Sequence, residues 1–157
     1  MDKIKAVVLD IDGVLTDGNF YWGSNGEELK KFSFSDVMGV SLGRKAGLIF
    51  ALISGESNTL IDRFAEKMGI VDIYKESRDK AAALCSFSKK YDLELSQICF
   101  MGDDVNDLQA LALAGLSAAP ANAHDSVKQK VMLITKSSGG QGAVRELVDL
   151  ILTNKGE

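Results

Sequence analysis

The sequence predicts an α/β fold with a doubly wound, mostly parallel sheet. Short apolar runs rich in β-branched residues alternate along the chain with helical patterns, as in proteins built from strand–helix units. The first run, residues 4–9, is continuously apolar, which is typical of a strand buried on both faces. The length of 157 residues fits one domain over 1–157, because a domain averages about 150 residues.

Each element is expected from its own pattern and from the turn residues beside it. Gly23–Gly26 separates two β-rich runs and predicts a β-hairpin over about 18–32. Gly47, Gly69 and Gly115 follow helical patterns, where glycine commonly ends a helix. The expected strands span residues 4–9, 19–22, 28–32, 48–53, 71–74, 98–101, 116–119 and 131–134. The expected helices span residues 37–46, 59–68, 80–91, 107–114 and 143–152.

The charge and the cysteine content limit which partners and which cellular compartment are expected. Lys and Arg total 18 against 22 Asp and Glu, and this net charge of -4 argues against binding nucleic acid or an anionic membrane. No apolar run approaches the ~20 residues that a membrane-spanning helix needs, and the first residues do not resemble a signal peptide. Cys85 and Cys99 lie in apolar patterns, which predicts two buried thiols in a reducing cytoplasm.

Polar side chains directly follow three of the expected buried strands. Asp10 and Asp12 come after the run 4–9, and Gly13 allows a sharp turn behind them. Ser54 follows the run 48–53, and Asp103 follows the run 98–101. Because ligands of such sheets bind at the carboxyl ends of the strands, we expect these groups to converge there.

The expected cluster has a chemical logic. Converging carboxylates repel one another unless a hard cation such as Mg²⁺ neutralises them, and Mg²⁺ prefers oxygen ligands. One carboxylate can then attack phosphorus, while a second moves protons to and from the leaving and attacking oxygens. Lys80, which begins the expected helix 80–91, can join a serine hydroxyl and a backbone N–H in holding phosphoryl oxygens.

These residues resemble the four motifs of the haloacid dehalogenase superfamily of phosphatases. The motifs stand in the family's order from Asp10 to Asp107: Asp10-x-Asp12-Gly13-Val14-x-Thr16-Asp17, then Ser54-Gly55, then Lys80, then Gly102-Asp103-Asp104-x-Asn106-Asp107. Any single piece is weak evidence, but the ordered series is highly specific.

The resemblance implies a role for each motif residue. Asp10 would be the nucleophile and Asp12 the general acid and base. Mg²⁺ would be held by Asp10, the backbone carbonyl of Asp12, and Asp103, with Asp104 and Asp107 around these ligands or replacing one of them. For Asp107, a plain helix cap remains the alternative. The transferring phosphoryl group would be bound by Ser54, the Gly55 amide and Lys80.

A second resemblance narrows the substrate. The run Gly139-Gly140-Gln141-Gly142-Ala143-Val144-Arg145-Glu146 is similar to the tail of phosphatases acting on 3-deoxy-2-ulosonic acid phosphates, such as Kdo 8-phosphate and Kdn or sialic acid 9-phosphate. The resemblance implies a substrate-binding tail over about 137–157, in which Gly140 and Gly142 let backbone approach the substrate. Arg145 could receive the substrate's carboxylate bidentately. Thr16 is a further expected substrate contact.

Glu56 and Lys67 bear on the length of the substrate. At the position of Glu56, the Kdo 8-phosphate group commonly has arginine and the nine-carbon branch tends to have glutamate; Lys67 also matches the nine-carbon branch. Glu56 could bond substrate hydroxyls, or it could only favour a helix dipole, with Lys67 on a solvated face. Eight-carbon and nine-carbon substrates therefore remain alternatives.

The spacing leaves no room for the cap domain that covers most sites of this superfamily. Asp12 and Ser54 are only about 42 residues apart, and the hairpin and one helix use most of that segment. In the resembling group, the hairpins of four subunits assemble and a neighbour closes each site, which implies a homotetramer. Two alternatives are a phosphatase for another small sugar phosphate or nucleotide, and a non-catalytic assembly module of the same fold.

Overall fold

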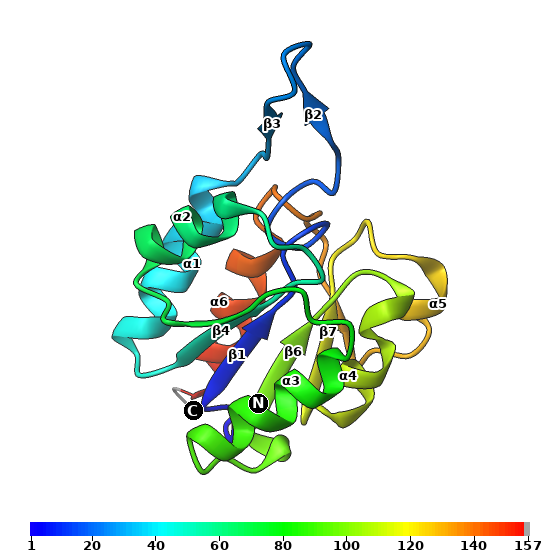
Figure 1. Ribbon diagram of the computed structural model, residues 1–157. Coiled ribbons are helices and arrows are strands. Elements are labelled where there is room, and N and C mark those ends of the chain that lie inside the picture. Colours follow the sequence, from blue (N-terminus) through cyan, green and yellow to red (C-terminus); the bar gives the residue numbers. More distant parts are fainter. Residues whose placement is uncertain (156–157) are drawn as a thin grey trace.

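The computed structural model describes residues 1–155, which form a six-stranded sheet with helices on both faces (Figure 1). Every strand pair of this sheet is parallel, in the order β5-β4-β1-β6-β7-β8. The predicted doubly wound α/β fold is confirmed. The strands are β1 (Ala6–Leu9), β4 (Ile49–Ile53), β5 (Asp72–Tyr74), β6 (Ile98–Met101), β7 (Leu116–Ala119) and β8 (Leu133–Ile134).

Two layers of helices explain why β1 is apolar throughout. Val7 and Leu9 pack toward α1 (Phe34–Lys45), α2 (Thr59–Met68) and α6 (Ala143–Lys155). Ala6 and Val8 pack toward α3 (Lys80–Lys90), α4 (Leu108–Leu113) and α5 (Asp125–Lys128). Successive side chains of a strand point to opposite faces, so a strand covered on both sides needs apolar residues at every position.

The register of β1 brings three chain segments together at one edge of the sheet. Leu9 at the end of β1 pairs with Leu52 of β4 on one side and Met101 of β6 on the other. The residues that follow these three strands therefore lie side by side. After β1 the chain adds β4 and β5 on one side of β1, and then β6, β7 and β8 on the other side. Such a reversal in the order of strands opens a crevice for ligands at their carboxyl ends.

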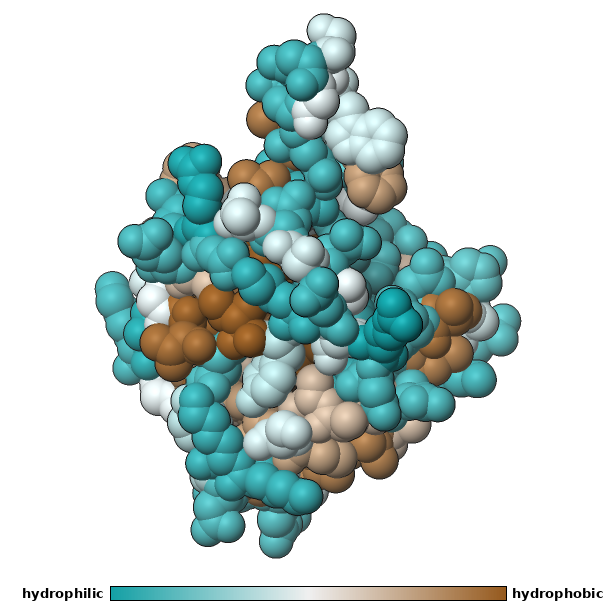
Figure 2. Space-filling view, in the orientation of Figure 1, coloured by the Kyte–Doolittle hydropathy of each residue, from teal (hydrophilic) through white to brown (hydrophobic). Residues whose placement is uncertain are grey.

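The predicted hairpin projects from the body above the carboxyl ends of the strands (Figure 1), and the same projection stands out at the top of the space-filling view (Figure 2). Its strands, β2 (Tyr21–Trp22) and β3 (Glu28–Leu29), are shorter than predicted, and a bridge between Thr16 and Phe32 closes its base. The exposed fractions of Phe20 and Trp22 are 67% and 71%. As expected, no cap domain covers the strand ends within residues 1–155.

Several predicted boundaries are corrected. The helix expected at 37–46 begins at Phe34, because the Ser33 hydroxyl accepts the Ser35 N–H and caps it earlier. The helix expected at 107–114 is divided into a 3₁₀ turn, Val105–Asp107, and α4.

Cys99 is buried as predicted, but Cys85 is only half-buried. Residues 156–157 of the predicted tail lie outside the described residues, and within 1–155 no helix is long and apolar enough to cross a membrane.

Candidate active site

A cleft of about 250 Å³ lies at the carboxyl ends of β1, β4 and β6. It brings together seven of the predicted site residues, which come from four separate segments of the chain. They are Asp10, Asp12, Gly55, Glu56, Lys80, Asp103 and Asp104. Residues from the base of the hairpin, among them Phe20 and Lys30, complete the wall on one side.

Lys80 connects two buried carboxylates at the floor of the cleft. Its Nζ lies 2.9 Å from Asp10 Oδ1 and 2.7 Å from Asp107 Oδ1, and its side chain is 2% exposed. Burial alone would lower the pKa of Lys80, but the charges of Asp10 and Asp107 outweigh that effect and raise it. Lys80 is thus a fixed positive charge beside the predicted nucleophile.

The side chain of Asp107 bonds to the backbone of the loop after β6. Its side chain is completely buried, and its Oδ2 accepts the N–H groups of Asp103 (2.9 Å) and Asp104 (3.3 Å). Oδ1 is taken by Lys80. Asp107 therefore closes the capping box of the 3₁₀ turn and holds Lys80 at the same time, and its side chain makes no cap bond to α4, the helix that follows it.

The buried carboxylates create a demand for a cation. Burial, and next the charge of Asp107, raise the pKa of Asp10 well above its ordinary value, although Lys80 counteracts this. The same two causes raise the pKa of Asp103 to about 7. Ligand oxygens of Asp10, Asp103 and Asp107 all lie within 4.8 Å of one another. A hard divalent cation fits this all-oxygen set. Asp10 and Asp103 are the more available ligands because both oxygens of Asp107 are already engaged, Oδ1 by Lys80 and Oδ2 by two backbone N–H groups.

Asp104 stands apart from this carboxylate cluster. Its Oδ1 accepts the N–H of the following residue, Val105, and its side chain lies at the exposed rim of the cleft. Among the described residues, the group that could hold a metal includes Asp107 rather than Asp104.

Asp12 is held by Lys30, a residue that the sequence did not single out. Lys30 Nζ lies 2.6 Å from Asp12 Oδ1 and 3.6 Å from Glu28, and the Lys30 side chain is 3% exposed. Burial lowers the pKa of Lys30, but bonding to Asp12 and Glu28 overcomes it and raises the pKa. No local pattern marks Lys30 as special, because the contact forms only when the hairpin returns beside the loop after β1.

Ser54 lies just beneath the cleft, and the next two residues, Gly55 and Glu56, line the cleft. Ser54 is 2% exposed, and its hydroxyl accepts the N–H of Glu56 at 3.0 Å, which leaves its own proton free to donate. Gly55 faces open space at the position of a Cβ. The predicted phosphate-binding residues are therefore adjacent to Lys80 and Asp10 in one small volume.

Thr16 is buried in its own loop rather than exposed to the cleft. It is 1% exposed, and its hydroxyl accepts the N–H groups of Gly13 (3.3 Å) and Gly18 (3.2 Å). It also donates to Asp12 Oδ1 at 3.4 Å. Thr16 faces the backbone of its own loop and shapes the turn that carries Asp12.

The two glycines of the tail lie in different surroundings: Gly140 packs against backbone, and Gly142 lines a surface depression. A Cβ on Gly140 would lie 2.7 Å from the backbone nitrogen of Asp17, so this residue packs behind the loop after β1. Gly142, with φ of +100°, donates its N–H to the buried carboxylate of Asp36 at 3.3 Å. Gly140 thus lets the tail pack closely against its own body, and a substrate contact of either glycine stays a prediction.

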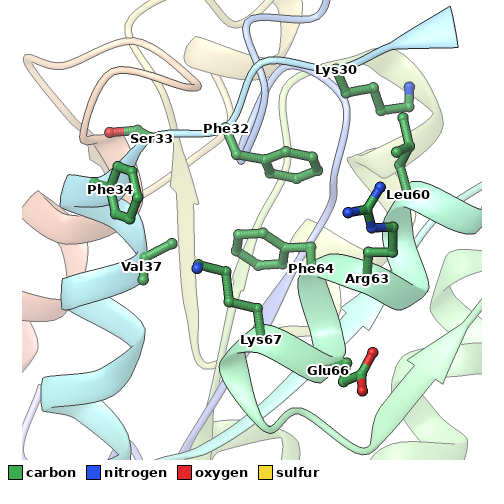
Figure 3. A pocket seen from close by; sticks show the side chains of 10 residues that line it. All are labelled: Lys30, Phe32, Ser33, Phe34, Val37, Leu60, Arg63, Phe64, Glu66 and Lys67. Carbon is green, nitrogen blue, oxygen red and sulfur yellow. The ribbon is translucent and has the colours of Figure 1, made fainter.

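Lys67 and Arg145 lie outside the cleft of their own chain. Lys67 lines a separate cavity of about 590 Å³ between α1 and α2, where Phe32 and Phe64 stack (Figure 3). Arg145 lines another depression, where its Nε pairs with Asp149 at 2.7 Å. Neither side chain lines the cleft that holds Asp10 and Asp12.

Comparison with known proteins places the chain in a family. A family model described as haloacid dehalogenase-like hydrolase matches residues 23–147. The chain belongs to the haloacid dehalogenase-like hydrolases. Among the relatives of this hydrolase, the 3-deoxy-D-manno-octulosonate 8-phosphate phosphatase KdsC of Salmonella typhimurium is 35% identical over 156 residues, which cover 99% of this chain and 83% of the relative. KdsC of Escherichia coli K12 is 34% identical over the same coverage.

Solved structures of similar hydrolases agree with the fold. The 3-deoxy-D-manno-octulosonate 8-phosphate phosphatase of Moraxella catarrhalis, in complex with magnesium, phosphate and a KDO molecule, superposes with a TM-score of 0.96 at 37% identity, covering 99% of this chain and 89% of that one. The phosphatase of the same name from Yersinia pestis gives a TM-score of 0.96 at 35% identity, covering 99% and 84%. These neighbours are similar over nearly the whole hydrolase.

Proposed function

We propose that this hydrolase is a Mg²⁺-dependent phosphomonoesterase that removes the terminal phosphate of a 3-deoxy-2-ulosonic acid. The observation that carries the proposal is the group formed by buried Asp10, Lys80 and Asp107 with half-buried Asp103 at the strand ends. This group combines a nucleophile, a fixed cation and oxygens suited to a metal within one cleft. The names of the relatives, and the magnesium, phosphate and KDO bound by the Moraxella neighbour, support the same reaction.

Asp10 is the proposed nucleophile. Its Oδ1 accepts from the Ile11 N–H at 2.8 Å and from Lys80, which leaves Oδ2 as the attacking oxygen. In the first step the Oδ2–P bond forms, the P–O bond to the sugar breaks, and Asp12 gives its proton to the leaving oxygen. In the second step Asp12 takes a proton from water as the water attacks phosphorus, and the Asp10–phosphorus bond breaks to release phosphate.

The remaining residues bind and orient the phosphoryl group. Lys80, the Ser54 hydroxyl and the Gly55 N–H would hold the phosphoryl oxygens while charge shifts among them. Asp10, the Asp12 carbonyl and Asp103 would hold Mg²⁺. When bound, this ion would neutralise negative charge in the cleft. We assign to Asp107 the support of Asp103 and Lys80, and to Asp104 a place at the rim.

The available observations support two different carbon numbers for the substrate. The names of the relatives favour the eight-carbon Kdo 8-phosphate. Glu56 lines the cleft and favours the nine-carbon Kdn or N-acetylneuraminate 9-phosphate, because the resembling nine-carbon branch tends to have glutamate there. We keep both as substrates of one proposed reaction.

We propose that neighbouring subunits complete each site in a homotetramer. Lys67 and Arg145 line cavities other than the catalytic cleft, which is consistent with contacts to a substrate bound by another copy of the chain. The exposed aromatic side chains of the hairpin are suited to such an interface. The two free cysteines favour a reducing compartment, and we propose the cytoplasm.

The decisive experiment compares kcat/KM for Kdo 8-phosphate, Kdn 9-phosphate, N-acetylneuraminate 9-phosphate and p-nitrophenyl phosphate, each with Mg²⁺ and with EDTA. We expect Mg²⁺-dependent hydrolysis and a clear preference for one sugar acid, because selectivity is a difference in transition-state binding. Equal values for all four compounds would indicate a phosphatase of another specificity. Absence of any Mg²⁺-dependent hydrolysis would favour a non-catalytic module.

A further inference from the structure

The loop after β7, Pro120–His124, contacts both loops that carry the carboxylates of the active site. The Asn122 side chain donates from Nδ2 to the carbonyl oxygen of Gly13 at 3.0 Å. The His124 N–H donates to the carbonyl oxygen of Asp103 at 2.8 Å. This short segment, which we call the brace loop, therefore spans from the loop of Asp10 and Asp12 to the loop of Asp103.

Asn122 has a second partner on the opposite side. Its Oδ1 accepts the N–H of Gly139 at 2.6 Å. Gly139 itself presses on the loop after β1, since a Cβ there would lie 2.0 Å from the Gly13 carbonyl oxygen. An amide is suited to this place because it offers both a donor and an acceptor in a fixed arrangement.

Gly13 is held at both ends of its backbone. Thr16 accepts its N–H at 3.3 Å, and Asn122 donates to its carbonyl oxygen. The peptide that carries the Gly13 N–H also carries the Asp12 carbonyl, and a planar trans peptide fixes the two groups together. Gly13 has φ of +81°, and a Cβ on it would lie 1.9 Å from Asp103 Oδ2, so the two loops meet at this residue.

We propose that Asn122 is a positioning residue for the hydrolase. It sets where the loop of Asp10 and Asp12 lies relative to Asp103, and so sets the oxygen arrangement that a divalent cation and a phosphoryl group encounter. It touches neither of them and acts through Gly13. The proposal rests on the proposed function for its kinetic consequence, but its structural consequence, a changed affinity for Mg²⁺, does not need turnover.

The test is the Asn122→Asp variant of the full chain. Aspartate keeps the shape and the acceptor for Gly139, but places an oxygen against the Gly13 carbonyl where a donor stood. We expect kcat for p-nitrophenyl phosphate to fall ~10- to 100-fold, as when residues that orient metal ligands are changed, with little change in KM. The Mg²⁺ concentration that gives half of the Mg²⁺-induced rise in melting temperature should increase by about the same factor.

Two further variants complete the test. Gln129→Ala, at an exposed position in the same region, is the matched control and should leave kcat and the Mg²⁺ midpoint unchanged. Asn122→Ala removes both hydrogen bonds and is measured in the same way in case the aspartate variant does not fold. A lower melting temperature with unchanged kcat and Mg²⁺ midpoint would show a merely structural role and overturn the proposal. Wild-type protein inactive on all phosphate esters would refute the proposed function, while the Mg²⁺ midpoint would still decide the role of Asn122.

Discussion

The Lys30 ammonium is buried between the hairpin and the loop after β1, where its partner is the carboxylate of Asp12. This contact gives Asp12 one orientation, and the Thr16 hydroxyl adds a second, weaker constraint on the same oxygen at 3.4 Å. A general acid and base must lie within hydrogen-bonding reach of the oxygen that it serves. In the proposed reaction, Lys30 therefore links the position of the hairpin to the orientation of the carboxyl group that would move the proton.

Replacing Lys30 by methionine should lower kcat for p-nitrophenyl phosphate. We expect a loss of ~10- to 100-fold, the size typical when a supporting partner of an active-site group is removed, with a small change in KM. Lys30→Arg should recover part of the loss because it restores the positive charge. Lys31→Met removes the neighbouring exposed lysine and is the matched control. A Lys30→Met enzyme with wild-type kcat would show that the ion pair is not needed.

At the residue scale, the groups that follow strands could be predicted, whereas those placed by the hairpin could not. Asp10, Ser54 and Asp103 stand next to buried strands, where a polar group is costly unless it is paired or binds a ligand. Lys30 meets Asp12 across a hairpin, and nothing in its neighbours along the chain encodes that contact. The bonds of Thr16 within its loop could not be predicted either, because a motif shows that a residue stands in the loop but not which way its hydroxyl points.

The hairpin cannot owe its stability to its own strands. β2 and β3 have two residues each, and an isolated hairpin is marginal in water even with longer strands. Its aromatic side chains, Phe20 and Trp22, contact each other with ring centroids 5.3 Å apart and remain mostly exposed. Such side chains gathered on a projecting element are typical of an interface.

The double variant Phe20→Ser/Trp22→Ser should reduce the oligomeric state. We expect a smaller mass by light scattering after size exclusion, because the apolar contact between hairpins is lost. The kcat/KM for the preferred sugar acid should fall more than that for p-nitrophenyl phosphate, which does not reach residues from a neighbour. Leu113→Ser, at an exposed apolar site on α4, is the control. An unchanged mass would argue against hairpin-mediated assembly.

At the element scale, the predicted limits hold where the chain carries a strong stop signal. α2 occupies its predicted span, since Asn58 caps its start and Gly69, with φ of +62°, ends it. α1 starts earlier than predicted because a cap at Ser33 decides its start, although Phe34 is 81% exposed and gives no apolar signal. The limits of the short helix α5 could not be predicted from an apolar pattern, since so brief an element has no measurable periodicity; its start is marked by the His124 side chain, which accepts the Ser126 N–H.

For the whole molecule, the alternation of strands and helices predicts the fold class but not the order of strands. The placement of β1 between β4 and β6 depends on how all the helices share the two faces of the sheet. That order gathers acidic side chains at one edge of a protein whose net charge is only -4. Folding therefore concentrates negative charge where a cation can offset it.

This concentration of charge should make stability depend on pH and on Mg²⁺ together. The pKa of Asp103 is raised from 3.8 to about 7, so between these values the folded state keeps a proton that the unfolded chain has released. The free energy of unfolding should therefore fall as pH rises through this window, and the full loss is present above about pH 7. Bound Mg²⁺ favours the ionised carboxylate and should offset the loss.

Melting temperatures measured with EDTA and with Mg²⁺ from about pH 5 to about pH 8 test this expectation. The stabilisation by Mg²⁺ should grow with pH in the wild type. In Asp103→Asn, both the loss of stability as pH rises and the growth of the Mg²⁺ effect should be smaller. A Mg²⁺ effect of constant size over the range would contradict the electrostatic account.

The central claim is that Asp10 accepts the phosphoryl group, and it is tested most directly by acid quenching during turnover of the preferred substrate with Mg²⁺. Mass spectrometry of the peptide that contains Asp10 should then reveal one added phosphoryl group in the wild type, removable by hydroxylamine. Asp10→Asn should fold, carry no adduct and show no turnover. Full turnover by Asp10→Asn, or a wild-type phosphoryl group found on a residue other than Asp10, would contradict the account.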